Sequence, residues 1–221
     1  PAATTPDEFW RQLETSLHLL KTDYLDLYQF HCVNQCYRPE DGTGMYECML
    51  KAKEQGMIRH IGVTAHKIGI AEECVASGLY ETMQFPFSYL SSVQELHLVE
   101  ACSRQNMGFI AMKALSGGLI HNSASAYAFM NQPQFAHVAP IWGIQKEKEL
   151  DEFLAHAACP PVLDEELKGQ IQKDIQQLSG DFCRGCGYCM PCPAGIEINN
   201  CARMSLMLRR APQADWLSKE W

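Results

Sequence analysis

The sequence predicts an α/β fold, in which a parallel sheet alternates with helices and is followed by a small helical domain rich in cysteine. Short segments rich in strand formers alternate with helical patterns along most of the chain of 221 residues. Near the C-terminus, four cysteines lie within ten residues. Strands separated by helices are typical of βαβ units, so we expect parallel strands joined by right-handed crossovers.

The expected elements follow from local signals. Thr5, Pro6 and Glu8 form a capping box with proline at the first helical position, which predicts the start of the first helix. Apolar periodicity and turn residues predict the rest. Strands are expected at residues 24–30, 58–63, 82–85, 108–112 and 137–142. Helices are expected at residues 6–20, 45–55, 67–77, 92–105, 123–130, 146–157, 163–178 and 199–210.

A composition break at Pro160 and Pro161 suggests a domain boundary. We therefore expect an α/β portion at residues 1–160 and a helical iron–sulfur domain at residues 161–221. The long loop 31–44, between the first strand and the second helix, is expected to shape a substrate pocket.

Composition argues against several classes of function. The formal net charge is −8 and the chain has no basic block, so we expect no nucleic-acid partner. No apolar run approaches the roughly 18 residues of a membrane span, so we expect no membrane association. Seven of the eleven cysteines are scattered singly in apolar surroundings. This pattern predicts free thiols, mostly buried, in a reducing compartment, and hence a cytoplasmic location.

The remaining cysteines, Cys183, Cys186, Cys189 and Cys192, are separated by two-residue spacers and end in a Cys-Pro step. Thiolates at this spacing are typical of iron–sulfur ligation, and the run predicts one [4Fe-4S] cluster. Cys201 is the reserve candidate for the fourth ligand. Zinc is the main alternative, although zinc sites usually pair two Cys-x-x-Cys knuckles across a long spacer.

Six segments together resemble a known family. Residues 12–31, 57–66, 83–87, 107–119 and 140–154 resemble, in order, the later strands and loops of aldo-keto reductases. Residues 183–198 resemble the ferredoxin-like tail of the iron–sulfur branch of that family. The resemblance implies a partial TIM (β/α)₈ barrel at residues 1–160, comprising about the last five βα units, with its site at the carboxyl ends of the strands.

The resemblance also implies roles for particular residues. His31 matches the active-site histidine, which can hydrogen-bond a substrate carbonyl oxygen. Ala65 and Ser88 stand where many family members have asparagine, so the usual amide contacts are in doubt. The implied binding site for NADPH or NADH consists of Thr64, Gln84, Met112, Lys113, Leu115, Gly117, Gly143, Gln145 and Lys146.

We therefore expect an oxidoreductase that reduces a small carbonyl substrate with NAD(P)H and carries a [4Fe-4S] cluster for electron transfer to a partner protein or for structure. The family's catalytic tyrosine, aspartate and lysine would precede Pro1, so this chain alone is expected to lack carbonyl reductase activity. The alternative is a non-enzymatic iron–sulfur electron carrier or binding module on a barrel remnant. A zinc-stabilised interaction protein is a third interpretation.

Overall fold

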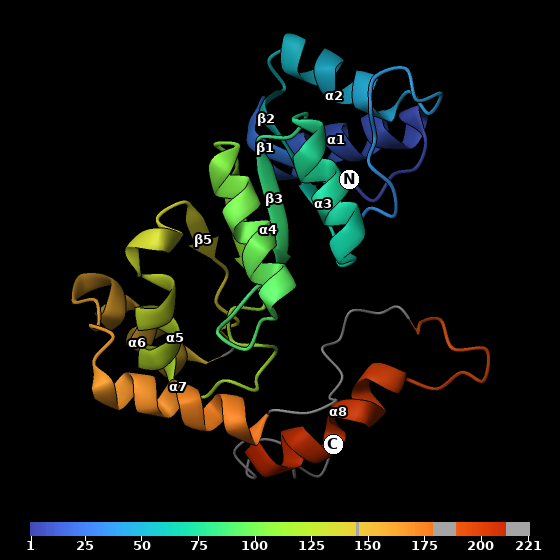
Figure 1. The fold of residues 1–221 in the computed structure, drawn as a ribbon. Helices are drawn as coiled ribbons and strands as arrows, with labels where there is room; N and C mark the ends of the chain where they lie inside the picture. Colours follow the sequence, from blue (N-terminus) through green and yellow to red (C-terminus); the bar gives the residue numbers. More distant parts are fainter. Residues whose placement is uncertain (145, 179–188, 211–221) are drawn as a thin grey trace. The chain divides into compact units, whose positions relative to one another are not determined.

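The computed structural model describes residues 1–144, 146–178 and 189–210, with side chains to residue 204. Figure 1 traces the alternation of strands and helices along the chain. The strands are β1 (Leu25–Phe30), β2 (Ile58–Thr64), β3 (Thr82–Pro86), β4 (Gly108–Met112) and β5 (Val138–Pro140). The helices are α1 (Pro6–Leu20), α2 (Met45–Glu54), α3 (Ile68–Ser77), α4 (Val93–Arg104), α5 (Ser123–Met130), α6 (Glu147–Ala158), α7 (Glu165–Gln177) and α8 (Ile198–Arg210), with a short 3₁₀ turn at Pro133–Phe135.

The strands form one five-stranded sheet whose spatial order follows the chain, β1-β2-β3-β4-β5. β1 pairs in parallel with β2, and β2 pairs in parallel with β3. A sheet that adds each new strand beside the previous one, with a helix between, is the arrangement of (β/α) barrel segments. The predicted α/β class with a parallel sheet is confirmed, and the order is consistent with part of a barrel.

The first helix forms as its local sequence predicts. The hydroxyl of Thr5 accepts a hydrogen bond from the backbone N–H of Glu8, and proline occupies the first turn of α1. Phe9, Leu13 and Leu17 are buried along one face of α1. Their spacing brings them onto one stripe of the helix, which is why an amphipathic segment packs in this way.

Gly62 lets the first strands pack closely. A Cβ atom at this position would lie 2.8 Å from Cγ of Gln29 on β1 and would also collide with the hydroxyl of Thr82 on β3. Because Gly62 is paired with residues of both neighbouring strands, a larger side chain would have to displace them.

Two compact units can be distinguished in the chain. The first comprises Pro1–Phe85 and Val93–Ile110, and the second comprises Pro86–Ser92 and Ala111–Trp221. The core of the first contains buried side chains such as Phe9, Phe30 and Met49. The core of the second is a cluster of Tyr89, Leu90, Leu119, Ile120, Ala126, Ile171 and Leu178. The expected domain boundary near residue 160 stays a prediction.

Some details differ from the expectations. β5 covers only Val138–Pro140, whereas a strand was expected at residues 137–142. Pro140 has no N–H to donate, and the ring of Trp142 stacks on Phe153 of α6 with 4.6 Å between ring centroids. In the part of the chain that the structure describes, no helix has the length and apolar character needed to cross a bilayer.

Candidate functional site

Three of the expected site residues lie on neighbouring strands of the first unit. His31 directly follows β1, Thr64 ends β2, and Gln84 is the middle residue of β3, paired in register with Thr64. The backbone connects these positions, because the N–H of Val33 donates to the carbonyl of Thr64 at 2.9 Å and the N–H of Ala65 donates to the carbonyl of Gln84 at 3.1 Å. The structure therefore brings the predicted residues to one edge of the sheet, where parallel strands expose their carboxyl ends.

The side chain of Thr64 makes a structural contact at this edge of the sheet. Its hydroxyl accepts a hydrogen bond of 2.6 Å from the backbone N–H of Cys32. Cys32 has a φ of 52°, a left-handed conformation that is costly for a residue other than glycine. Thr64 thus stabilises the turn after β1, and its own hydroxyl hydrogen remains a potential donor to a ligand.

His31 is exposed and lies beside a hollow. The hollow has a volume of about 540 Å³, and His31, Val33 and Tyr37 are among the residues that line it. The backbone N–H of His31 donates to the carbonyl of Pro1 at 2.9 Å, which holds the end of β1. The imidazole therefore lies at the surface of a concave site within the first unit.

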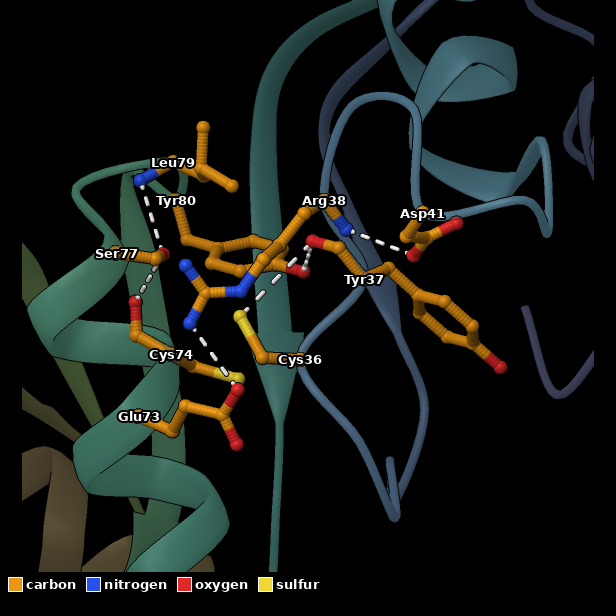
Figure 2. A network of polar contacts seen from close by, with 9 residues as sticks. All are labelled: Cys36, Tyr37, Arg38, Asp41, Glu73, Cys74, Ser77, Leu79 and Tyr80. Atoms are coloured by element: carbon orange, nitrogen blue, oxygen red, sulfur yellow. Dashed lines mark hydrogen bonds and ion pairs between the residues drawn. The ribbon is translucent and has the colours of Figure 1, made fainter.

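The loop 31–44 is tied to the rest of the first unit by the contacts in Figure 2. The hydroxyl of Tyr80 donates to the backbone carbonyl of Tyr37 at 2.7 Å. Arg38 forms an exposed ion pair of 3.1 Å with Glu73 of α3. These two contacts anchor the middle of the loop, close to the residues that line the hollow.

Cys36 of this loop and Cys74 of α3 are both buried and lie near each other (Figure 2). Burial, with further contributions from the charge of Cys36 and a hydrogen bond to it, raises the pKa of Cys74. A thiol with a raised pKa is protonated at neutral pH and reacts slowly, because the thiolate is the nucleophile. Cys74 is therefore a core residue of α3 beneath the loop, and it is not a candidate for a catalytic nucleophile.

In the second unit, Met112 ends β4, and the loop after this strand contains three further expected cofactor residues, Lys113, Leu115 and Gly117. The backbone of this loop is unusual, because Lys113 and Ser116 have positive φ angles of 56° and 50° and are followed by two glycines with positive φ. Such a run of left-handed residues can point several backbone groups in one direction. We refer to residues 113–118 as the β4 loop.

Side chains hold the β4 loop from two directions. The hydroxyl groups of Ser116 and Ser88 share a hydrogen bond of 2.7 Å. Arg203 of α8 donates from Nη2 to the carbonyls of Ser116 and Gly117, each at 2.9 Å. The sequence reasoning missed Ser116 and Arg203, because no local signal links residues that are 87 positions apart.

The remaining cofactor residues lie around the start of α6. Gly143 and Lys146 are exposed, and Gln145 lies outside the described residues. The carboxylate of Glu149 accepts a hydrogen bond from the backbone N–H of Lys146 at 3.2 Å, and Glu147 lies in the same turn. These two carboxylates would repel a phosphate at this helix N-terminus, although the helix end itself favours anions.

Comparison with known proteins identifies the fold. Residues 1–137 match the model of the aldo/keto reductase family. The chain belongs to this family. A comparison with curated proteins found no match.

Solved aldo-keto reductases share the fold. A protein from Pseudomonas aeruginosa that is assigned to this family has 18% identity and a TM-score of 0.57, and the alignment covers 71% of this chain and 60% of that one. The holo form of an aldo-keto reductase from Bacillus halodurans has 18% identity and a TM-score of 0.60, with 78% and 68% covered. A thermostable aldo-keto reductase in complex with epalrestat has 21% identity and a TM-score of 0.58, with 79% and 68% covered. The chain thus spans about 60% of the length of the first of these relatives.

The cysteine run of this aldo/keto reductase family member lies beyond the residues that match the family model. Cys183 and Cys186 lie outside the described residues. Cys189 and Cys192 are free thiols, and Cys189 Sγ donates to Oδ1 of Asn199 at 3.6 Å. Among the described residues, which include two of these four cysteines, no three His, Cys, Asp or Glu side chains form a group that could hold a metal ion.

The two described cysteines, Cys189 and Cys192, have the chemistry of cluster ligands. Both have free thiols, and the thiol of Cys189 is exposed. They come from one short segment with no helix or strand between them. Soft thiolates in an irregular segment are the ligands that iron–sulfur clusters use. Cys201, the reserve ligand, is also free and exposed, and lies in the first turn of α8.

Proposed function

We propose that this chain is part of an NAD(P)H-dependent aldo-keto reductase that reduces a small carbonyl compound. The family membership of residues 1–137 supports the class of reaction. The observation that carries the proposal is the arrangement of His31 after β1, Thr64 at the carboxyl end of β2 and Gln84 level with Thr64 on β3. The carboxyl ends of adjacent parallel strands are the position of the active site in (β/α) barrels.

In this proposal a bound nicotinamide would supply the hydride, and the chain would bind and orient the reactants. His31 would donate a hydrogen bond to the substrate carbonyl oxygen, where negative charge develops. The free hydroxyl hydrogen of Thr64 and the half-buried amide of Gln84 would hold the carboxamide of the nicotinamide ring. Met112 would cover that ring.

The family resemblance assigns the phosphates of the nucleotide to residues of the second unit. Lys113, Leu115 and Gly117 would line the pyrophosphate, because the left-handed β4 loop presents its backbone at close range. Gly143, Gln145 and Lys146 would receive a terminal phosphate. The carboxylates of Glu147 and Glu149 oppose that last assignment and favour NADH over NADPH.

Nucleotide binding tests this proposal. We expect the chain to bind NADH or NADPH, as measured by the change in nicotinamide fluorescence. Gln84→Ala should weaken binding about tenfold, the effect of losing one buried hydrogen bond of roughly 1–1.5 kcal/mol. Gln94→Ala, which removes an exposed glutamine of α4, is the matched control. A chain with no affinity for either nucleotide would contradict the proposal.

We propose further that Cys183, Cys186, Cys189 and Cys192 hold a [4Fe-4S] cluster. The cluster would pass single electrons to a partner protein or would stabilise the tail. A redox titration separates these roles, because a structural cluster would be inert to mild reductants. Anaerobically purified protein should contain about four iron and four sulfide per chain, with absorbance near 400 nm.

A serine scan identifies the ligands. Cys189→Ser should lower the iron content and the absorbance, whereas Cys159→Ser should leave both unchanged. Cys159 is a good control because it is also exposed but lies at the end of α6, outside the run. Cys201→Ser tests the reserve ligand in the same way. Zinc in place of iron, in a colourless protein, would overturn the assignment.

A non-enzymatic electron carrier is the second candidate function. The observation that favours it is the acidic start of α6, which opposes phosphate binding where the family resemblance expects it. A protein that contains the cluster but does not bind a nicotinamide nucleotide would support this candidate.

A further inference from the structure

One arginine connects the tail of the chain to the β4 loop. Arg203 Nη2 donates to the carbonyls of Ser116 and Gly117, which are neighbours in the loop and both lie 2.9 Å from the same nitrogen. A hydrogen bond from a cationic donor is stronger than one from a neutral donor. The Nε of Arg203 is buried and has no partner among the described residues, so the orientation of the guanidinium depends on these two bonds.

The contact is close enough to require glycine. A Cβ atom at Gly117 would lie 2.9 Å from Nη2 and 3.0 Å from Nη1 of Arg203. Gly117 also has a φ of 63°, which glycine adopts without steric cost. Both the conformation of the loop and its contact with α8 therefore depend on the same residue.

The β4 loop needs such an anchor because its backbone is strained. Ser116 has a φ of 50°, a left-handed conformation that is unfavourable for a residue other than glycine. Within the loop, the N–H of Ser116 donates to the carbonyl of Lys113 and the N–H of Gly118 donates to that of Leu115. These short-range bonds and the pair of Ser116 with Ser88 leave the carbonyls of Ser116 and Gly117 to be satisfied by Arg203.

The same helix also reaches the cysteine run. Asn199 precedes Arg203 by four residues, so the two side chains lie on one face of α8. Asn199 accepts a hydrogen bond from the thiol of Cys189 at 3.6 Å. A thiolate that ligates a cluster has no S–H, so the Nδ2 group of the same amide would then donate to the sulfur. One face of α8 thus contacts a candidate cluster ligand at one turn and the candidate cofactor loop at the next.

We propose that Arg203 is a positioning residue that fixes the β4 loop for nucleotide binding, so that α8 couples the cysteine run to the cofactor site. The inference rests on the proposed function, because it assigns the β4 loop to the nucleotide. Arg203 acts through the backbone of Ser116 and Gly117 and takes no part in the chemical step.

Hydrogen exchange tests the positioning role without relying on activity. In Arg203→Gln, the amides of Ser116, Gly118 and Ile120 should exchange roughly tenfold faster, because local opening of the loop becomes easier. Arg203→Lys, which keeps the charge but not the fork of donors, should give an intermediate rate. Arg104→Gln removes an exposed arginine of α4 and should leave these rates unchanged. Unchanged exchange in Arg203→Gln, with the far-ultraviolet circular dichroism of the wild type, would overturn the proposal.

Nucleotide titration tests the coupling. Arg203→Gln should weaken binding of NADH or NADPH by roughly tenfold, as expected when the bound loop conformation is no longer favoured. Removing iron from the wild-type protein should also weaken binding of the nucleotide. Removing iron from Arg203→Gln should leave the affinity of that variant unchanged. Equal affinities for the wild type and Arg203→Gln would overturn the coupling.

The two proposals can fail separately. If the wild-type chain binds no nicotinamide nucleotide, the proposed function fails and the assignment of the β4 loop to the nucleotide fails with it. Faster exchange in Arg203→Gln would still support the role of Arg203 in fixing the loop. If the wild type binds nucleotide and Arg203→Gln changes neither exchange nor affinity, only the inference about Arg203 fails.

Discussion

At the scale of single residues, Glu81 shows how one carboxylate can organise the start of a strand. It accepts hydrogen bonds from Lys53 at 2.7 Å and from the backbone N–H of Ile61 at 3.1 Å, and it also pairs with His60. Burial acts to raise the pKa of Glu81, but the hydrogen bonds from His60, Lys53 and Ile61 outweigh it and lower the pKa to about 2. The ionised form is therefore favoured in the folded protein.

We predict that Glu81→Gln lowers the free energy of unfolding at pH 7 by about 0.5–1 kcal/mol, a small effect because the side chain is 40% exposed and solvent screens its charge. Because the folded pKa lies below the unfolded value of roughly 4.5, the ionised carboxylate stabilises the fold fully above that pH. This contribution should be lost as the pH falls from about 4.5 to about 2. Urea unfolding of the wild type and the variant at several pH values measures it.

The control for this measurement is Glu72→Gln, which removes an exposed carboxylate of α3. The difference in free energy of unfolding between Glu72→Gln and the wild type should change much less over the same pH range. A Glu81→Gln variant whose difference from the wild type is the same at pH 7 and pH 2.5 would contradict the role assigned to Glu81.

Residues of this kind also mark the limit of sequence reasoning. The capping residues Thr5 and Glu8 could be recognised because their partners lie within one turn. Glu81 and Arg203 could not, because their partners lie 20 or more positions away and meet only in the folded chain. Thr64 was recognised as a site residue, but the hydrogen bond that Cys32 donates to its hydroxyl depends on the fold.

At the scale of elements, a buried polar contact fixes α7 to the rest of the second unit. The hydroxyl of Tyr89 donates to Oδ2 of Asp174 at 2.6 Å, and Gln170 donates to Oδ1 at 3.2 Å. Asp174 is only 3% exposed, so water cannot easily replace a lost donor. Ile171 and Leu178 of the same segment are buried in the apolar cluster beside this contact.

We predict that Tyr89→Phe lowers the free energy of unfolding by about 1–3 kcal/mol, because a buried carboxylate loses one of its donors while the apolar packing stays. Urea unfolding monitored by the fluorescence of Trp142, which packs against the same cluster, measures the change. Tyr24→Phe is the control, since Tyr24 is only half-buried and lies in the first unit. A loss no greater than that of the control would show that the contact does not hold α7.

The order and type of the elements could be predicted, because helix caps and apolar periodicity are local properties. α7 illustrates this, with its expected range of 163–178 and its observed range of Glu165–Gln177 capped by Asp164. β5 was predicted too long, because its end is set by the stacking of Trp142 with Tyr127 and Phe153 from other elements. The strand-end location of His31 and Thr64 was predictable for a different reason, since parallel strands align their carboxyl ends.

At the scale of the whole molecule, the chain contains two compact units, each with its own core, and Trp10 lies in the first unit whereas Trp142 lies in the second. Trp10 of the first unit packs edge-on against the buried Phe9, with ring centroids 5.4 Å apart. Trp142 of the second unit packs against the cluster that contains Leu178, the last described residue before the cysteine run. The two indoles therefore report on different parts of the chain.

Loss of the proposed cluster should affect these parts unequally. We predict that chelation of iron lowers the urea midpoint reported by Trp142 by an amount equivalent to about 1–3 kcal/mol, because a metal that binds only the folded tail stabilises the elements packed beside it. The midpoint reported by Trp10 should stay the same. Variants with a single tryptophan, made by replacing the other three tryptophans with phenylalanine, separate the two signals. Equal shifts of both midpoints would show instead that the tail stabilises the chain as one cooperative unit, and no shift at Trp142 would show that the cysteine run contributes nothing to the fold.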